Sequence, residues 1–277
     1  MTQRIDAHHH LWHYTPEEFG WIDDRMGRLR RDFLVDDFGQ ELSAAGWAGS
    51  VAVQARQSLQ ETDWLLSLAD KSAFLRGVVG WAPIASDRFP ALLEELSSRP
   101  LLKGLRHVIQ DEPDDDYILG AEFNRGVASM MGSGLAYDIL ILPRQLPAAT
   151  QFVDRHPEQV FILDHIAKPP ICSQEVEPWL RHITELARRE NVYCKLSGVV
   201  TEADWSAWSI NDLRPFADAV LEAFSPRRLM AGSDWPVCLL ASSYGRWIDT
   251  LGDLLAGISQ PERDRIFGET AIEAYHL

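Results

Sequence analysis

The sequence predicts a single α/β domain with the fold of a (β/α)8 barrel, the architecture known as a TIM barrel. Eight short apolar runs rich in β-branched residues recur along the chain, and helical patterns separate them. Most of these runs follow one another at intervals of roughly 30 residues, the size of one βα unit. The length of 277 residues suits such a barrel, which typically needs about 250 residues.

Each predicted strand is an apolar run that ends at polar or turn-forming residues. The eight runs are Ile5–His10, Ser50–Gln54, Leu75–Trp81, Leu101–Arg106, Ala136–Leu140, Val160–Leu163, Val192–Lys195 and Arg228–Ala231. A doubly wound open sheet is the alternative fold. The first strand, however, is not followed by the G-x-G-x-x-G sequence that is typical of dinucleotide-binding sheets.

The segments between the strands carry apolar residues three and four positions apart, as amphipathic helices do. The clearest are Leu65 with Leu68 and Ala69, then Leu180 with Ile183, Leu186 and Ala187, and the segments Leu92–Leu96, Phe123–Met130, Leu146–Val153 and Phe216–Phe224. No linker rich in Pro, Gly or Ser divides the chain, so residues 1–277 are predicted to form one domain. The connection from Trp12 to Asp32 is too polar and irregular for the core. We expect it to lie over the mouth of the barrel.

Composition and charge limit the classes of partner. Hydrophobic residues make up 46% and charged residues 24% of the chain, as in ordinary soluble proteins. With 26 basic and 41 acidic side chains the net charge is −15, so the overall field repels nucleic acids and acidic membranes. The sequence has neither a signal peptide pattern nor an apolar run long enough to span a bilayer. Three well-separated cysteines favour a reducing, cytoplasmic location.

The first predicted strand ends in three consecutive histidines. His8 and His10 are two positions apart, so their side chains face the same side of the strand while His9 faces away. In a barrel, polar residues at the carboxyl ends of strands are the usual catalytic candidates. Two converging imidazoles suit a metal ion or a developing oxyanion. A buried, hydrogen-bonded pair with a structural role is the alternative.

The sixth and eighth strands end in further ionisable residues. Asp164, His165 and Lys168 follow the sixth strand, where such groups are costly to bury unless they are paired or used. A structural ion pair between Asp164 and Lys168 explains two of them equally well, which leaves His165 as the stronger functional candidate. Asp234 follows the eighth strand; an aspartate before a Pro-containing turn is commonly a turn residue, and its position after the last strand makes it a candidate.

The other strand ends offer groups that suit ligand binding. Arg106 closes the fourth strand, and its guanidinium can hold a carbonyl or carboxylate oxygen with two donors. A salt bridge at the rim with the acidic run 111–116 is the alternative. The remaining polar and aromatic residues at strand ends are Gln54, Arg56, His107, Lys195, Ser197, Trp12, Trp81 and Trp235. Aromatic walls with a few polar groups are typical of a site for a sugar-like ligand.

Five motifs occur at the predicted strand ends, in the order IDAHHHLW, KGLRH, LDHIAKP, YCKLSG and GSDWP. Together they resemble the amidohydrolase superfamily almost from end to end. More narrowly, they resemble its amidohydrolase 2 branch of sugar-lactone hydrolases, typified by L-fuconolactonase and L-rhamnono-lactonase. The resemblance implies a barrel in which His8, His10, His165 and Asp234 face one site.

The resemblance also bears on metals. Superfamily members with two metals carry a lysine or glutamate at the fourth strand and a histidine at the fifth. This chain has Arg106 with His107 and Tyr137 with Asp138 at those places, so a bridged two-metal site is not expected. The resemblance to this branch implies that no metal is required. A single Zn²⁺ could still be held by the set His8, His10 and Asp234, which is chemically adequate for that ion.

The activity implied by the resemblance is hydrolysis of a sugar lactone to its aldonic acid. The expected small-molecule substrate is L-fucono-1,5-lactone or a related 1,4- or 1,5-lactone. We expect Asp234 to activate water as a general base. The groups expected to polarise the carbonyl are Arg106, His8, His10 and His165. The residues expected to contact the substrate are Trp12, Gln54, Arg56, His107, Lys168 and Trp235.

Three other activities compete with this expectation. A metal-dependent decarboxylase of the same superfamily would use the same histidines to hold Zn²⁺. A lactonase for an aromatic-pathway dicarboxylate would need several arginines, of which Arg106 and Arg56 are fewer than expected. A catalytically inactive binding protein is disfavoured by the complete set of His8, His10, His165 and Asp234.

Overall fold

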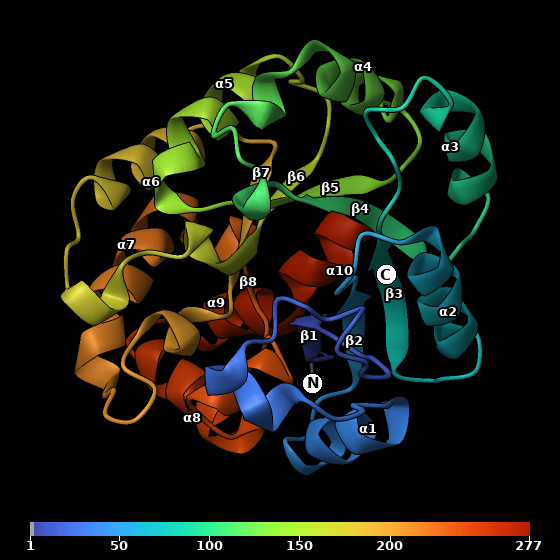
Figure 1. Ribbon diagram of the computed structural model, residues 1–277. Helices are drawn as coiled ribbons and strands as arrows, with labels where there is room; N and C mark the ends of the chain where they lie inside the picture. Colours follow the sequence, from blue (N-terminus) through green and yellow to red (C-terminus); the bar gives the residue numbers. More distant parts are fainter. Residues whose placement is uncertain (1–2) are drawn as a thin grey trace.

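The computed structural model describes residues 3–277, and within them eight parallel strands form one sheet in the order β1 to β8 (Figure 1). The strands are β1 (Ile5–His9), β2 (Gly49–Val53), β3 (Leu75–Gly80), β4 (Leu102–Val108), β5 (Ala136–Leu140), β6 (Phe161–Leu163), β7 (Val192–Leu196) and β8 (Leu229–Ala231). Every predicted strand is confirmed. The fold is the predicted (β/α)8 barrel.

Helices surround the sheet and cover its outer face (Figure 1). They are α1 (Val35–Ala44), α2 (Leu59–Ala69), α3 (Phe89–Ser97), α4 (Ala121–Ser129), α5 (Leu146–Asp154), α6 (Trp179–Ala187), α7 (Ile210–Arg228), α8 (Tyr244–Leu254), α9 (Gln260–Asp264) and α10 (Thr270–Tyr275). The helical patterns identified in the sequence lie in α2 to α7, whereas α1 and α8 are not among them. None of the helices in residues 3–277 has both the length and the apolar character that a membrane span requires.

Backbone hydrogen bonds link the end of β1 to the segment that follows β8. The amide of His10 donates to the carbonyl of Trp235 (2.6 Å), and the amide of Asp234 donates to the carbonyl of His8 (2.8 Å). A further parallel bridge joins His9 to Trp235. These bonds make the barrel nearly closed, and they also place the end of β1 beside Asp234.

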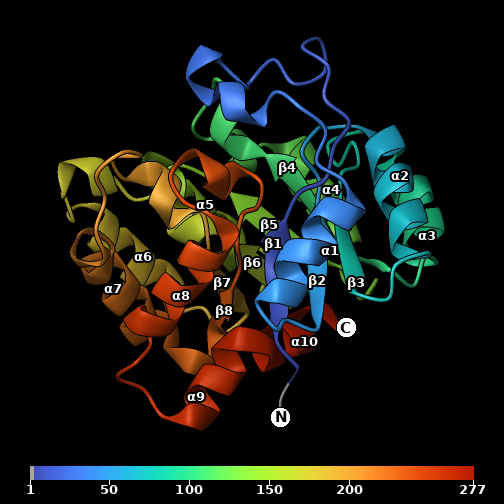
Figure 2. The same cartoon turned by 90° about the horizontal axis from the view of Figure 1, so that it is seen from below.

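The lower half of the barrel is filled by small and branched side chains from alternating strand positions. This cluster contains Ile5, Ala7, Val51, Val53, Val79, Ala136, Ile162 and Met230, together with Ala271, Ala274 and Tyr275 of α10. Helix α10 therefore closes the barrel at the end where the strands begin. In Figure 2, α9 and α10 lie at the lower end of the barrel, and the blue segment that follows β1 lies at the upper end.

The segment 12–34 covers the mouth of the barrel, as the sequence predicts, but the expectation that it is too polar for the core is wrong. Its aromatic and aliphatic residues Trp12, Phe19, Ile22, Leu29 and Phe33 are all at most 3% exposed. Trp12 and Phe33 exchange two backbone hydrogen bonds of 2.9 and 3.0 Å. The polar residues of the segment face solvent between these anchors. The segment is thus a folded cover with its own apolar interior.

We expect Phe33→Ala to lower the free energy of unfolding by about 3–5 kcal/mol, the usual cost of truncating a buried phenylalanine. The ring of Phe33 packs edge-on against Trp12 and Trp235, with centroids 5.4 and 5.2 Å apart. Urea unfolding measures the change. Met131→Ala is the control, since Met131 is 59% exposed; equal, small losses in both variants would contradict the anchoring role of Phe33.

Candidate active site

β1 and the residue that follows it bring His8 and His10 to the mouth of the barrel. His9 faces outward, as predicted, and stacks on Phe38 of α1 with ring centroids 3.8 Å apart. Ala7 packs in the lower barrel cluster, and its neighbour His8 also contacts residues inside the barrel. Two consecutive residues face inward because the pairing of β1 with β2 shifts register in this stretch.

The two imidazoles contact each other through their Nε2 atoms, which lie 3.2 Å apart. The Nδ1 atom of His10 lies 2.8 Å from the carbonyl oxygen of Val53. A carbonyl accepts hydrogen bonds, so Nδ1 of His10 carries the proton and its Nε2 is an acceptor in the neutral ring. The Nε2–H of His8 can then donate to it, and Nδ1 of His8 accepts from Lys195 Nζ at 3.1 Å. This arrangement satisfies every ring nitrogen of the pair.

A left-handed turn after β6 positions His165. The four residues 165–168 all have positive φ, between 48° and 59°, at a cost of roughly 1–2 kcal/mol for each residue. The Nδ1 atom of His165 lies 2.9 Å from Ser197 Oγ. Gly198 faces the ring so closely that a Cβ there would lie 2.5 Å from Nδ1 of His165. The ring therefore needs both the unusual turn and the absence of a side chain at Gly198.

Asp234 projects from the segment after β8, again from a left-handed backbone conformation (φ 57°). Its Oδ1 atom lies 3.4 Å from His10 Nε2, 3.9 Å from His8 Nε2 and 3.9 Å from His165 Nε2. One carboxylate oxygen is thus the common neighbour of three imidazoles. Strained backbone at two of these positions is typical of functional sites.

A buried network of charges lies beneath the histidines. Lys195 Nζ lies 2.6 Å from Asp138 Oδ2 and 2.9 Å from Asp164 Oδ1. Arg106 Nη1 donates to Asp164 Oδ2 (2.8 Å), and the hydroxyl of Tyr275 donates to Asp138 Oδ2 (2.6 Å). All five residues are at most 3% exposed. The network connects helix α10 to the underside of the site.

This network overturns two structural alternatives that the sequence leaves open. Asp164 pairs with Arg106 and Lys195, so the expected alternative of an Asp164–Lys168 ion pair is wrong; Lys168 lies instead 3.9 Å from Glu202. The left-handed turn separates the two residues, because Asp164 points into the barrel before the turn and Lys168 lies at its end. A rim salt bridge of Arg106 with the run 111–116 is also wrong, because Arg106 is buried.

The protonation states follow from burial and from neighbouring charges. Burial, reinforced by Lys195, holds the pKa of His8 well below its usual value, and burial lowers the pKa of His165 to about 4. Burial opposes ionisation of Asp234, but the neighbouring histidines outweigh it and lower its pKa. In the same way Lys195 and its neighbours outweigh burial and hold the pKa of Asp164 well below the usual range. Near neutral pH the site therefore combines neutral His8 and His165 with an ionised Asp234.

Above this group opens a cavity of about 530 Å³. Six predicted site residues line it: His10, Arg56, Arg106, His165, Lys168 and Asp234. The covering segment adds Glu18, Trp21 and Met26, and the turn after β7 adds Thr201, Glu202 and Trp205. His8 is fully buried below the cavity floor. The carboxyl ends of the strands and the cover of the barrel mouth thus enclose one polar site.

Four residues predicted to contact the substrate do not line this cavity. Trp12 and Trp235 are buried in the aromatic interior of the covering segment. The backbone and side-chain oxygens of Gln54 accept hydrogen bonds from Arg106, so Gln54 supports that residue from behind. His107 is hydrogen-bonded to the loop after β4. Position at a strand end does not fix the direction of a side chain, and these four point elsewhere.

Several residues of the site are not predicted, or only weakly indicated, by the sequence pattern. The sequence offers Lys195 only as one of several polar residues at strand ends, and Asp138 only as a departure from the two-metal pattern. A charged residue inside an apolar strand is costly to bury unless it is paired. The occurrence of Lys195 and Asp138 in two apolar strands therefore indicates a buried ion pair. No sequence pattern indicates Glu202, Trp21 and Trp205, because they lie in loops whose place over the barrel depends on the tertiary fold.

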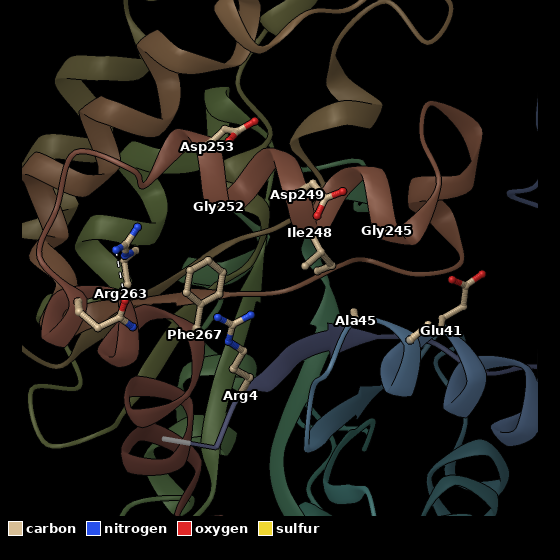
Figure 3. A pocket seen from close by; sticks show the side chains of 12 residues that line it. Arg4, Glu41, Ala45, Gly245, Ile248, Asp249, Gly252, Asp253, Arg263 and Phe267 are labelled. Atoms are coloured by element: carbon tan, nitrogen blue, oxygen red, sulfur yellow. Dashed lines mark hydrogen bonds between the residues drawn. The ribbon is translucent and has the colours of Figure 1, made fainter. Parts of the chain in front are cut away.

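A second cavity, of about 670 Å³, lies at the side of the barrel between α1, α8 and α9 (Figure 3). Figure 3 shows the side chains of Arg4 and Phe267 beside each other, and Glu41 on α1. Arg4 precedes β1, so this cavity is near the end of the barrel where the strands begin. It contains no histidine among its lining residues. The strand-end cavity is therefore the candidate active site.

The donor set at the strand ends fits a divalent metal ion. Ligand atoms of a tetrahedral Zn²⁺ site lie roughly 3.3 Å from one another when each bond is near 2.0–2.1 Å. The corresponding separations among His8, His10 and Asp234 are 3.2, 3.4 and 3.9 Å. The second nitrogens of both histidines have the carbonyl or carboxylate neighbours that metal-bound histidines usually have, Val53 and Asp164.

The fold and the site together define an enzyme of the amidohydrolase type, with histidines from β1, a histidine after β6 and an aspartate after β8. The amidohydrolase family model matches residues 5–277. The chain therefore belongs to the amidohydrolase family.

Its relatives include two curated bacterial proteins named L-fucono-1,5-lactonase. The protein from Burkholderia multivorans is 39% identical, over 99% of this chain and 96% of its own length. The protein from Burkholderia ambifaria is 36% identical, over 100% of this chain and 97% of its own. A solved amidohydrolase structure from Burkholderia multivorans, with bound Zn, superposes with a TM-score of 0.96 at 38% identity and covers 99% of both chains. The family and the fold inferred from the sequence are thus confirmed.

We expect the free energy of unfolding to fall as the pH drops from about 6.5 to 4, by about 3 kcal/mol from His165 alone. Burial lowers the folded-state pKa of His165 to about 4, whereas an unfolded histidine titrates near 6.5. The unfolded state therefore binds more protons over this range. In His165→Asn the fall should be smaller, as measured by urea unfolding with chelator present. His13→Asn is the control, because the side chain of His13 is 62% exposed; the same slope in all three proteins would contradict the prediction.

Proposed function

We propose that the protein hydrolyses a sugar lactone to its aldonic acid, with L-fucono-1,5-lactone or a closely related 1,4- or 1,5-lactone as substrate. The observation that carries this proposal is the carboxylate of Asp234, one oxygen of which lies within 3.9 Å of three imidazoles at the floor of the strand-end cavity. Full-length relatives at 36–39% identity carry the name of this activity. Sugar-lactone hydrolysis is therefore better supported than metal-dependent decarboxylation or hydrolysis of an aromatic-pathway dicarboxylate lactone.

In the proposed reaction Asp234 is the general base. Its carboxylate faces the cavity, and the neighbouring histidines lower its pKa, so it is ionised and can accept a proton from water at neutral pH. The water oxygen forms a bond to the lactone carbonyl carbon, and the carbonyl becomes a tetrahedral oxyanion. Asp234 then returns the proton to the ring oxygen as the bond between that oxygen and the former carbonyl carbon breaks.

The groups beside Asp234 are suited to stabilise the oxyanion. His165 faces the carboxylate of Asp234 and lines the cavity, so its Nε2–H can donate to the oxygen of a lactone attacked at that point when its Nδ1 accepts from the Ser197 hydroxyl. In His10 the proton lies on Nδ1, so this ring orients its neighbours and does not donate from Nε2. Arg106 lines the cavity as well, and its bonds to Asp164 and Gln54 hold the guanidinium in place. Donors that are fixed before the reaction stabilise developing charge without reorganisation.

The pairing of the cavity cations favours a neutral substrate over an aromatic-pathway dicarboxylate. Arg56 forms an ion pair with Glu18 and Arg106 forms one with Asp164, which leaves Lys168, 3.9 Å from Glu202, as the single cavity cation without a hydrogen-bonded acidic partner in residues 3–277. A dicarboxylate would need cations that are free to pair with it. Two solved structures that bear the name 2-pyrone-4,6-dicarboxylic acid hydrolase and one named 5-carboxyvanillate decarboxylase share the fold at only 15–22% identity, so they carry no argument about substrate.

The site is also suited to hold one Zn²⁺ on His8, His10 and Asp234. When bound, such an ion acts as a Lewis acid toward a carbonyl oxygen or a water molecule. We propose that it is not required, because His8, His10, Val53 and Lys195 satisfy one another's hydrogen bonds without it. The Asp234 carboxylate keeps its place through the backbone bond to His8.

Asp234→Asn is expected to lower kcat for lactone hydrolysis by about 10²–10⁴-fold, the usual contribution of a general base. An asparagine keeps the size of the side chain but cannot accept the proton. The test follows acid release from L-fucono-1,4-lactone, L-galactono-1,4-lactone and L-rhamnono-1,4-lactone with a pH indicator. Asp218→Asn, at an exposed position in α7, is the matched control. Retention of most of the activity in Asp234→Asn would refute the assignment.

Removal of metal by a chelator is expected to leave most of the lactone hydrolysis intact. Adding Zn²⁺ to the chelator-treated protein should nevertheless raise its unfolding temperature by several degrees, because the ion binds the folded state alone. His10→Gln should abolish this rise. A chelated protein that folds but recovers hydrolysis only with Zn²⁺ would show that the metal is essential.

A further inference from the structure

We propose that Glu202 determines substrate selectivity, by accepting a hydrogen bond from a hydroxyl of the sugar lactone and by repelling anions from the cavity. This inference rests on the proposed lactonase function and names the side chain that recognises the neutral, hydroxylated substrate. The argument depends on where Glu202 lies, on its hydrogen-bond partners and on the aromatic residues beside it.

Glu202 lies in the 3-10 turn Val199–Glu202 that follows β7, and its side chain lines the cavity. The side chain is only 26% exposed. Its ion-pair partner is Lys168, at the end of the left-handed turn after β6, with Nζ 3.9 Å from Oε1. At this distance the pair is too long for a direct hydrogen bond. Within residues 3–277 no side chain or backbone amide donates a hydrogen bond to the Glu202 carboxylate.

The other acidic residues around the cavity are already engaged. Glu18 forms an ion pair with Arg56, and Asp111 accepts a hydrogen bond from its neighbour Gln110 at 3.2 Å. Asp234 is surrounded by histidines and serves the chemical step. Glu202 differs from them in that its carboxylate is mostly buried and accepts no hydrogen bond within residues 3–277. A mostly buried carboxylate gains most from a hydroxyl donor, since such charge-assisted bonds are stronger than neutral ones.

The surroundings of Glu202 suit a sugar ring. Trp205 follows it by three residues and lines the same cavity, with its indole fixed by a 2.8 Å hydrogen bond from Nε1 to the carbonyl of Thr201. Trp21 of the covering segment also lines the cavity and is 40% exposed. Aromatic faces pack against the C–H groups of a sugar ring, and a carboxylate beside them accepts from its hydroxyls.

The charge of Glu202 also separates substrate from product. Burial raises the pKa of Glu202, Lys168 lowers it, and the negative charge of Asp234 raises it further, so the two carboxylates interact across the cavity. The lactone is neutral, whereas the aldonate released by hydrolysis is an anion. Like charges in a partly desolvated site repel each other. The same side chain that binds the substrate thus weakens binding of the product.

The test compares wild type with Glu202→Gln in steady-state hydrolysis of L-fucono-1,4-lactone and in inhibition by L-fuconate. We expect KM to rise about tenfold, the loss of one charge-assisted hydrogen bond, and kcat to change by less than about threefold. The inhibition constant of L-fuconate should rise at least about threefold less than KM does, because the product also loses the hydroxyl contact but no longer meets a like charge. For δ-valerolactone, which has no hydroxyl groups, the two proteins should have equal kcat/KM.

Two controls exclude a merely structural effect. Glu158→Gln, at an exposed position before β6, should match wild type in every assay. Glu202→Asp should keep the weak inhibition by L-fuconate because it keeps the charge. Unfolding temperatures are measured for all variants, and binding of L-fuconate by calorimetry provides a readout that does not depend on turnover.

The outcomes separate this inference from the function on which it rests. If wild type hydrolyses the hydroxylated lactone and Glu202→Gln has unchanged KM and unchanged inhibition by L-fuconate, the role of Glu202 is refuted and the lactonase function stands. An equal loss with δ-valerolactone would also refute it, because the effect would not depend on hydroxyls. If wild type hydrolyses none of the sugar lactones, the proposed function fails and the inference fails with it.

Discussion

The buried ion network of Lys195 with Asp138 and Asp164 is the interaction on which the geometry of the site depends. Lys195 Nζ contacts both carboxylates and also Nδ1 of His8. Removing one member of such a network leaves an unpaired charge in the barrel, which typically costs about 3–5 kcal/mol. Tyr275 of α10 donates a hydrogen bond to Asp138. The network therefore connects α10, which closes the end of the barrel where the strands begin, with the histidines at its mouth.

Backbone strain supplies the second constraint on the site. His165 and Asp234 both have left-handed conformations, and the whole run 165–168 does so. These conformations turn the side chains of His165 and Asp234 toward each other at the mouth of the barrel, where extended strands would not direct them. Two glycines provide space for the imidazole rings. A Cβ at Gly198 would clash with the ring of His165, and a Cβ at Gly232 would lie 2.9 Å from Cβ of His8. The stability of the network offsets this strain.

The fold could be predicted from the sequence because each βα unit contains its own signal, an apolar run followed by a helical pattern. The inward direction of His8 and His10 and the opposite direction of His9 followed from strand alternation. The alternation also implied that Ala7 faces away from His8, and a register shift overrides it. Which aromatic residues line the cavity was not predictable. The burial of Trp12 and Trp235 and the exposure of Trp21 depend on how the covering segment folds over the barrel, and no local pattern encodes that.

The carboxylates of the site fall into two groups, one paired with cations below the cavity floor and one facing the cavity. This difference bears on how the cavity binds a neutral substrate and a charged product. Asp138 and Asp164 are committed to Lys195 and Arg106 below the floor and never meet the ligand. Their pairing holds Lys195 below the floor and fixes the position of Arg106. Asp234 and Glu202 remain at the surface of the cavity, where each lacks a cation at hydrogen-bonding distance among the lysines and arginines of residues 3–277. In the proposed reaction a neutral lactone meets no opposition from these charges, and hydrolysis adds the negative charge of the aldonate to the cavity. The charges of Asp234 and Glu202 then oppose retention of the aldonate.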